Sequence, residues 1–142
     1  MPERAPFEYV IVRVVPRVER GECVNAGVIL ICRPKKFLAA RVHLDRKRVL
    51  ALDPSMPPET LDAIEAQLSL VPTIASAQRS SDPIARMDIG ERWHWLSAPS
   101  STMLQPSPVH TGLCIDPSAE LDELFAELVD TAPRLRKRHA PA

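Results

Sequence analysis

The chain has 142 residues, a length that fits one compact domain. Eighteen basic residues balance eighteen acidic ones, and this zero net charge argues against global disorder and against nucleic-acid binding by bulk positive charge. No apolar run reaches the roughly 18 residues of a transmembrane helix, and residues 1–6 lack the apolar region of a signal peptide. With three cysteines and no Cys-x-x-Cys pair, we expect a protein of the reducing cytoplasm with no membrane partner.

The N-terminal third is predicted to form a three-strand meander. Three segments rich in β-branched and aromatic side chains are expected to be strands: residues 7–15, 24–32 and 37–44. Their connections are too short for parallel crossovers, so the strands must run antiparallel. Both faces of the first strand are largely apolar, which predicts a central strand. Arg13 would then be a covered charge, and we expect Glu22 as its partner. Gly27 predicts a β-bulge or a close approach by another group.

Helices and two short strands are predicted to follow. The expected helices are residues 46–52 after the cap Asp45, a helix from Pro58 that Pro72 ends or kinks, residues 89–96 after the cap Asp88, and residues 117–129 after the cap Asp116. Residues 103–105 and 109–115 read as strands. Residues 78–86 read as an exposed connection. In the third helix we expect Trp95 and Leu96 in the core.

These elements predict a fold of the α+β class. An antiparallel sheet, built on the N-terminal meander, packs against several helices in a single domain over residues 1–130. A basic, flexible C-terminal tail is expected over residues 131–142.

The first motif that exceeds what folding needs lies at the entry of the second strand. Glu22 and Asn25 stand three residues apart with a glycine on either side, so a ligand can approach them closely. The structural alternative is a β-bulge, in which Asn25 bonds its own turn and Glu22 pairs with Arg13 or Arg20. Both interpretations remain open at this point.

The second motif is a stiff polar stretch over residues 100–112. His110 can act as an acid, a base or a ligand, or can simply bond the backbone. No second His or Cys lies at metal-ligand spacing, so no metal is expected. Ser101 and Ser107 lack the Gly-x-Ser-x-Gly pattern of a hydrolase nucleophile.

The third motif is the tryptophan-containing segment of residues 91–96. Trp93 can stack on a base or a partner if it is exposed, and Arg92 can reach a phosphate or remain a solvated charge. The chain has no glycine-rich phosphate-binding loop, so no nucleotide cofactor is expected.

The same segments carry a resemblance to a known family. The residues that carry it are the Arg-Val-Val-Pro of 13–16, the Gly-Glu-Cys-Val-Asn-Ala-Gly-Val of 21–28, the Arg-Trp-His-Trp-Leu-Ser-Ala-Pro of 92–99 and the Gln-Pro-Ser-Pro-Val-His-Thr-Gly of 105–112. In these the chain resembles the bacterial domain-of-unknown-function family 3037, from about Tyr9 to Val129. The resemblance implies recurrent polar positions at Glu22, Asn25, Gln105, His110 and Thr111. It also implies a partner, since family members are often encoded beside kinase-like proteins of the HipA type.

These observations lead to three hypotheses about the function. The favoured hypothesis is a non-catalytic binding or partner module, because no complete catalytic motif occurs. The resemblance implies that this module is an accessory to a HipA-type kinase. Its binding residues are Arg13, Glu22, Asn25, Arg92, Gln105, His110 and Thr111. The second hypothesis is a small hydrolase or nuclease-like enzyme, which requires Glu22 and His110 to converge in one cleft. The third is a nucleic-acid binder that uses Arg92, Trp93 and the basic tail, against which the neutral charge argues.

Overall fold

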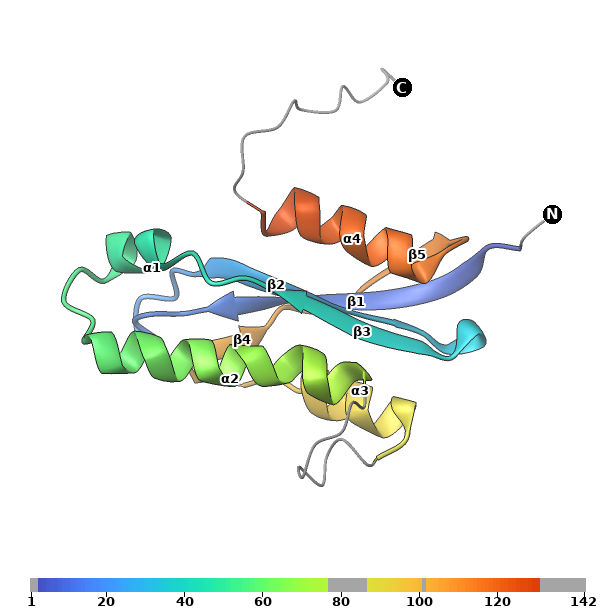
Figure 1. Cartoon of the computed structure of the whole chain (residues 1–142), viewed down its shortest axis with the longest axis horizontal. Helices are drawn as coiled ribbons and strands as arrows, with labels where there is room; N and C mark the ends of the chain where they lie inside the picture. The colour runs from blue at the N-terminus through green and yellow to red at the C-terminus, as the bar shows by residue number, and fades with distance from the viewer. Residues whose placement is uncertain (1–2, 77–86, 101, 131–142) are drawn as a thin grey trace, which may run out of the picture.

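The computed structural model describes residues 3–76, 87–100 and 102–130. Five antiparallel strands form one sheet with helices on both faces, as Figure 1 shows. The predicted α+β class is therefore confirmed. The predicted connection over residues 78–86 and the predicted tail over residues 131–142 lie outside the described residues.

The N-terminal meander forms as the sequence predicts. Its elements are β1 (Ala5–Val14), β2 (Val24–Cys32), the short 3-10 turn η1 (Arg33–Lys35) and β3 (Phe37–Val42). The spatial order β3-β2-β1 places β1 inside the sheet, and β4 and β5 pair with its other edge. Lys36 adopts a left-handed conformation, with φ of 52°, where the 3-10 turn passes into β3.

Two short strands share the remaining edge of β1. β4 (Leu104–Pro106) pairs with residues 12–14 and β5 (His110–Cys114) pairs with residues 5–9. Between them, Ser107 makes two hydrogen bonds to Ile11: its N–H donates to the Ile11 carbonyl over 2.8 Å, and its Oγ accepts from the Ile11 N–H over 2.8 Å. Its hydroxyl donates to the Pro108 carbonyl. Proline has no N–H to donate to a ladder, so a broken edge strand suits the Pro-Ser-Pro sequence.

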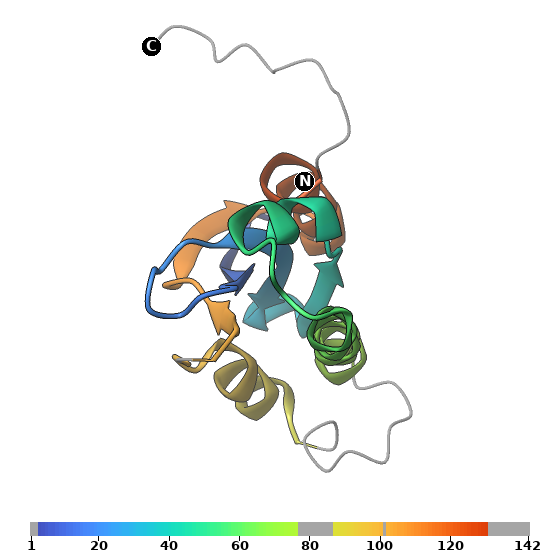
Figure 2. The same ribbon diagram turned by 90° about the vertical axis from the view of Figure 1, so that its left-hand side faces the viewer.

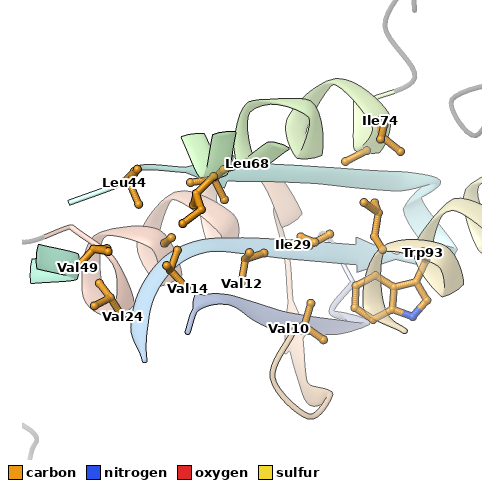
Figure 3. Close-up of a cluster of buried hydrophobic side chains, with 14 of the residues drawn as sticks. Val10, Val12, Val14, Val24, Ile29, Leu44, Val49, Leu68, Ile74 and Trp93 are labelled. Carbon is orange, nitrogen blue, oxygen red and sulfur yellow. The ribbon is translucent and has the colours of Figure 1, made fainter. Parts of the chain in front are cut away.

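Side chains alternate along β1 and therefore pack into two separate cores, one on each face of the sheet. Val10, Val12 and Val14 point to the face covered by α2 (Pro58–Ser76) and α3 (Ile89–Ser97), where Trp93 joins them (Figure 3). On the opposite face, Ala5 and Phe7 pack under α4 (Pro117–Leu128). Figure 2 shows the sheet between these helical layers. The short helix α1 (Arg46–Leu52) adds the buried Val49 to the first core.

Three helices begin at the aspartates that the sequence predicts as caps. Asp45, Asp88 and Asp116 each accept a hydrogen bond from a backbone N–H of the first turn. Asp45 accepts from the N–H of Arg48, Asp88 from the N–H of Glu91, and Asp116 from the N–H of Ser118. The backbone N–H of Glu91 also holds the pKa of the Asp88 carboxyl below its ordinary value.

Two details differ from the sequence-based expectation. Pro72 does not end α2, which continues to Ser76; the side chains beyond it, Ile74 and Ala75, are buried in the core and hold the last turn in place. The two tryptophans also exchange roles, since Trp93 is 2% exposed and Trp95 is 50% exposed. Positions three apart share a helix face, so Leu96 buries together with Trp93 and not with its neighbour.

Ser107→Ala tests the bond that joins the two halves of the edge strand. The substitution leaves the buried N–H of Ile11 without its acceptor, so we expect the free energy of unfolding to fall by about 1–3 kcal/mol. Urea denaturation measures this loss. Ser55→Ala is the control, because the Ser55 hydroxyl is exposed and bonds only Asp53, and it should change stability by less than about 0.5 kcal/mol. Equal effects of the two substitutions would contradict the role of Ser107.

Candidate functional site

The structure distributes the predicted site residues over both faces and one end of the sheet. Arg13, Asn25 and Gln105 lie side by side on three neighbouring strands, because Arg13 pairs with Asn25 of β2 and with Gln105 of β4. We call these three residues the polar row. The other predicted residues, Glu22, Arg92, His110 and Thr111, lie away from it.

A β-bulge brings Asn25 into the polar row. Val12 pairs with Gly27 and Arg13 pairs with Asn25, so Ala26 is an extra residue in β2. An extra residue reverses the alternation of side chains beyond it. Val28 therefore packs under α4, whereas Ala26 joins the core under α2 and Asn25 turns to the face of α4. The bulge predicted at Gly27 is confirmed.

Gly27 also fulfils the second expectation, a close approach by another group. A Cβ atom at this position would lie 2.8 Å from Cγ1 of Val42 and 3.0 Å from the carbonyl oxygen of Arg41. The group that approaches is thus β3, and glycine lets β2 and β3 stay in register beside the bulge.

Each amide of the polar row donates one hydrogen bond to a backbone carbonyl and not to Arg13. Nδ2 of Asn25 donates to the Leu128 carbonyl at the end of α4 over 3.1 Å, and Nε2 of Gln105 donates to the Thr102 carbonyl over 2.8 Å. Asn25 thus bonds α4 and not its own turn. Arg13 is half-buried, and within the described residues its side chain has no hydrogen bond or ion pair.

Glu22 pairs with Arg20 and not with Arg13. Nε of Arg20 lies 2.6 Å from Oε1 of Glu22, and both side chains are largely exposed in the β1–β2 connection. The expectation that Glu22 neutralises Arg13 is therefore wrong. The sequence left Arg13 and Arg20 open as partners of Glu22, and the structure has Arg20.

His110 and Glu22 do not converge. His110 is opposite Tyr9, and Val24, two residues after Glu22, is opposite Val14. Tyr9 and Val14 are five residues apart on β1, so at 3.3 Å per residue they are separated by about 16 Å. This distance removes the dyad that a His110–Glu22 hydrolase or nuclease requires.

The two residues singled out on β5 point to opposite faces. The exposed His110 ring stacks on Tyr9, with 5.0 Å between the ring centroids. Thr111 pairs with Glu8 on the other face and borders a small cavity of about 210 Å³ at the end of the sheet. Glu8, beside it, forms an ion pair with Arg33.

Arg92 is engaged within the fold. Its guanidinium donates to the Met87 carbonyl over 2.6 Å and to the Ala75 carbonyl over 3.4 Å, so it ties the start of α3 to the end of α2. Its Nε is buried and has no partner within the described residues. The half-buried Arg92 is therefore neither a solvated charge nor free to reach out to a phosphate.

One cavity in the described part of the chain was not predicted from sequence. It is a groove of about 460 Å³ between α2, the end of α3 and β4. Its apolar lining includes Leu70, Val71, Ile74, Trp95, Leu96 and Leu104. Leu70 and Trp95 are each 50% exposed. We call this the apolar groove. The groove does leave a signal in the sequence. Each helix carries one large apolar residue, Leu70 in α2 and Trp95 in α3, outside its periodic row of buried residues.

The described residues contain neither a metal-binding cluster nor a membrane-spanning helix. No three His, Cys, Asp or Glu side chains gather there in a way that could hold a metal ion. Among the helices of this part, none is long and apolar enough to cross a bilayer.

The three cysteines differ in exposure. Cys23 is exposed, whereas Cys32 and Cys114 are buried in the core under α4. Cys32 therefore acts as a small apolar residue of this core. Burial, followed by the neighbouring Cys32, raises the pKa of the Cys114 thiol to about 11.

This difference predicts selective alkylation. At pH 8 only on the order of one thousandth of Cys114 is thiolate, which is the reactive form. Iodoacetamide should therefore modify Cys23 quickly in the folded protein, and Cys32 and Cys114 only after denaturant is added. Mass spectrometry of the digested protein reads this out. Modification of Cys114 as fast as Cys23 in the native protein would contradict the prediction.

Comparison with known proteins gives one match. The family model described as "Protein of unknown function (DUF3037)" matches residues 9–129. No curated protein and no solved structure matches the chain.

Proposed function

Because the chain belongs to the DUF3037 family, a family of unknown function, we propose from its own geometry that it is a non-catalytic protein-binding module. The observation that carries this proposal is the apolar groove between α2, α3 and β4. The groove takes up an apolar segment of a partner protein.

The chemistry of the groove selects this occupant. None of the described residues that line it is charged, so a charged segment would lose its hydration there without gaining a partner. An apolar segment would instead bury the exposed halves of Leu70 and Trp95. Tryptophan is also the residue type that most often dominates the affinity of a protein interface.

The competing functions have less support. The separation of Glu22 from His110 along β1 argues against the hydrolase or nuclease hypothesis, which required the two side chains to converge. The nucleic-acid hypothesis used Arg92 and Trp93, but Arg92 bonds two backbone carbonyls and Trp93 is buried. Trp93 therefore cannot stack on a base.

A kinase-like protein of the HipA type is the first candidate partner. This part of the proposal rests on the family resemblance, which implies such proteins as genomic neighbours. The groove supports an apolar contact with a partner and does not select a kinase over another protein.

Leu70→Ala and Trp95→Ala test the groove. Both side chains are half exposed, so we expect little loss of stability, whereas affinity for a purified HipA-type kinase-like protein should fall about tenfold or more in titration calorimetry. Val18→Ala is the control, because Val18 is a similarly exposed aliphatic residue outside the groove. Equal affinity of all four proteins would overturn the groove as the binding site. No binding by wild type would overturn this partner.

A selection from displayed random peptides tests the module without naming a partner. Peptides enriched on wild type and lost on Trp95→Ala should be apolar in the segment that binds. A failure to enrich any such peptide, with wild type and variant equally folded by circular dichroism, would count against a protein-binding function of the groove.

A further inference from the structure

We propose that the polar row is a binding site for a carboxylate group of a partner polypeptide. Arg13 provides the charge, and the amides of Asn25 and Gln105 flank it on the neighbouring strands. This inference goes beyond the proposed function, because Arg13 and Asn25 lie on the α4 face of the sheet and do not line the groove, whereas Gln105 borders both sites.

The first argument is an uncompensated charge. Three arginines in the described part of the chain are half-buried, namely Arg13, Arg46 and Arg92. Arg46 pairs with two carboxylates and Arg92 donates to two backbone carbonyls. Arg13 has neither kind of partner within the described residues. The Arg13 guanidinium therefore remains available to an acceptor from another molecule, and a carboxylate is the acceptor that its geometry matches.

The second argument is the set of donors around this charge. Directly opposed residues on neighbouring antiparallel strands have Cβ atoms about 5 Å apart, so both amides start beside Arg13. Each amide nitrogen carries two hydrogens and uses one in its bond to Leu128 or Thr102. One donor of Asn25 and one of Gln105 therefore remain next to the guanidinium, whose fork matches a carboxylate in two parallel hydrogen bonds.

The charge of the site favours a carboxylate over a phosphate. The polar row has one positive charge and two neutral amides, so one negative charge balances it. The carbonyl of Leu128, bonded to Asn25, belongs to the C-terminal end of α4, where the helix dipole is negative. That end further disfavours a doubly charged phosphate.

The surface beside the row extends along β1 toward a stacked pair of rings, the half-buried Tyr9 and the exposed His110. Tyr9 is on the same face of β1 as Arg13, four residues away, and His110 stacks on it. At 3.3 Å per residue this separation is about 13 Å. A polypeptide that places its carboxylate on Arg13 can therefore also reach the stacked rings, which a small free anion cannot.

Sodium acetate, titrated against sodium chloride at equal ionic strength, tests the site in the full chain. The readout is the ¹⁵N spectrum of the Arg13 Nε–H group and the Asn25 and Gln105 amides. We expect saturable shifts of all three with acetate only. Arg13→Met should weaken acetate binding at least tenfold, and the control Arg41→Met should leave it unchanged, because Arg41 already pairs with Asp122.

The other outcomes decide against the proposal. Tighter binding of inorganic phosphate than of acetate would overturn the choice of carboxylate. Shifts that do not saturate, or that persist in Arg13→Met, would overturn the site. Arg13→Met should be as stable as wild type, since it removes an uncompensated charge. A loss of stability together with absent shifts would make Arg13 a structural residue.

Arg13→Lys covers the case in which the methionine variant does not fold. It keeps the charge but loses the planar fork, so acetate binding should weaken severalfold while the fold is retained. Unchanged acetate binding in this variant would contradict two-point recognition. Both experiments leave the groove intact, so their failure would not count against the proposed protein-binding function.

Discussion

β1 is hydrogen-bonded along both of its edges, and the rest of the structure depends on this pairing. One edge is taken by β2 and the other is divided between β4 and β5. Each partner has an irregularity, the extra residue Ala26 in β2 and the break at Ser107. Ser107 completes the ladder at the break, and Gly27 leaves room for β3 beside the bulge. A buried backbone group without these contacts would be destabilising.

The bulge also decides the chemistry of the two faces. In a strand with regular alternation, Asn25 would lie in the apolar core under α2, where an amide without a partner is costly. The extra residue turns Asn25 toward α4, where it bonds Leu128 and flanks Arg13. The sheet thus places Arg13 and Asn25 on the face opposite the apolar groove, while Gln105 of β4 borders both.

Local features were predictable because their physical causes are local. Aspartate caps, the period of apolar residues and the bulge at Gly27 each depend on a few neighbouring residues. The partner of Glu22 was not predictable, since nothing in the spacing of Glu22 distinguishes Arg13 from Arg20. Glu22 pairs with Arg20, which is nearer along the chain, because both residues lie within one exposed connection. The tryptophans exchanged roles because helix phase, and not adjacency to Leu96, determines which ring is buried.

The sequence by itself determined the α+β class, the central place of β1 and the position of most elements, because hydrophobic periodicity and capping are properties of short segments. Only the tertiary structure decided which polar residues meet. Strand pairing brings Arg13, Asn25 and Gln105 together from distant parts of the chain and keeps His110 away from Glu22. The apolar groove likewise forms where α2, α3 and β4 meet. A shape built by three separate segments leaves no pattern in any one of them.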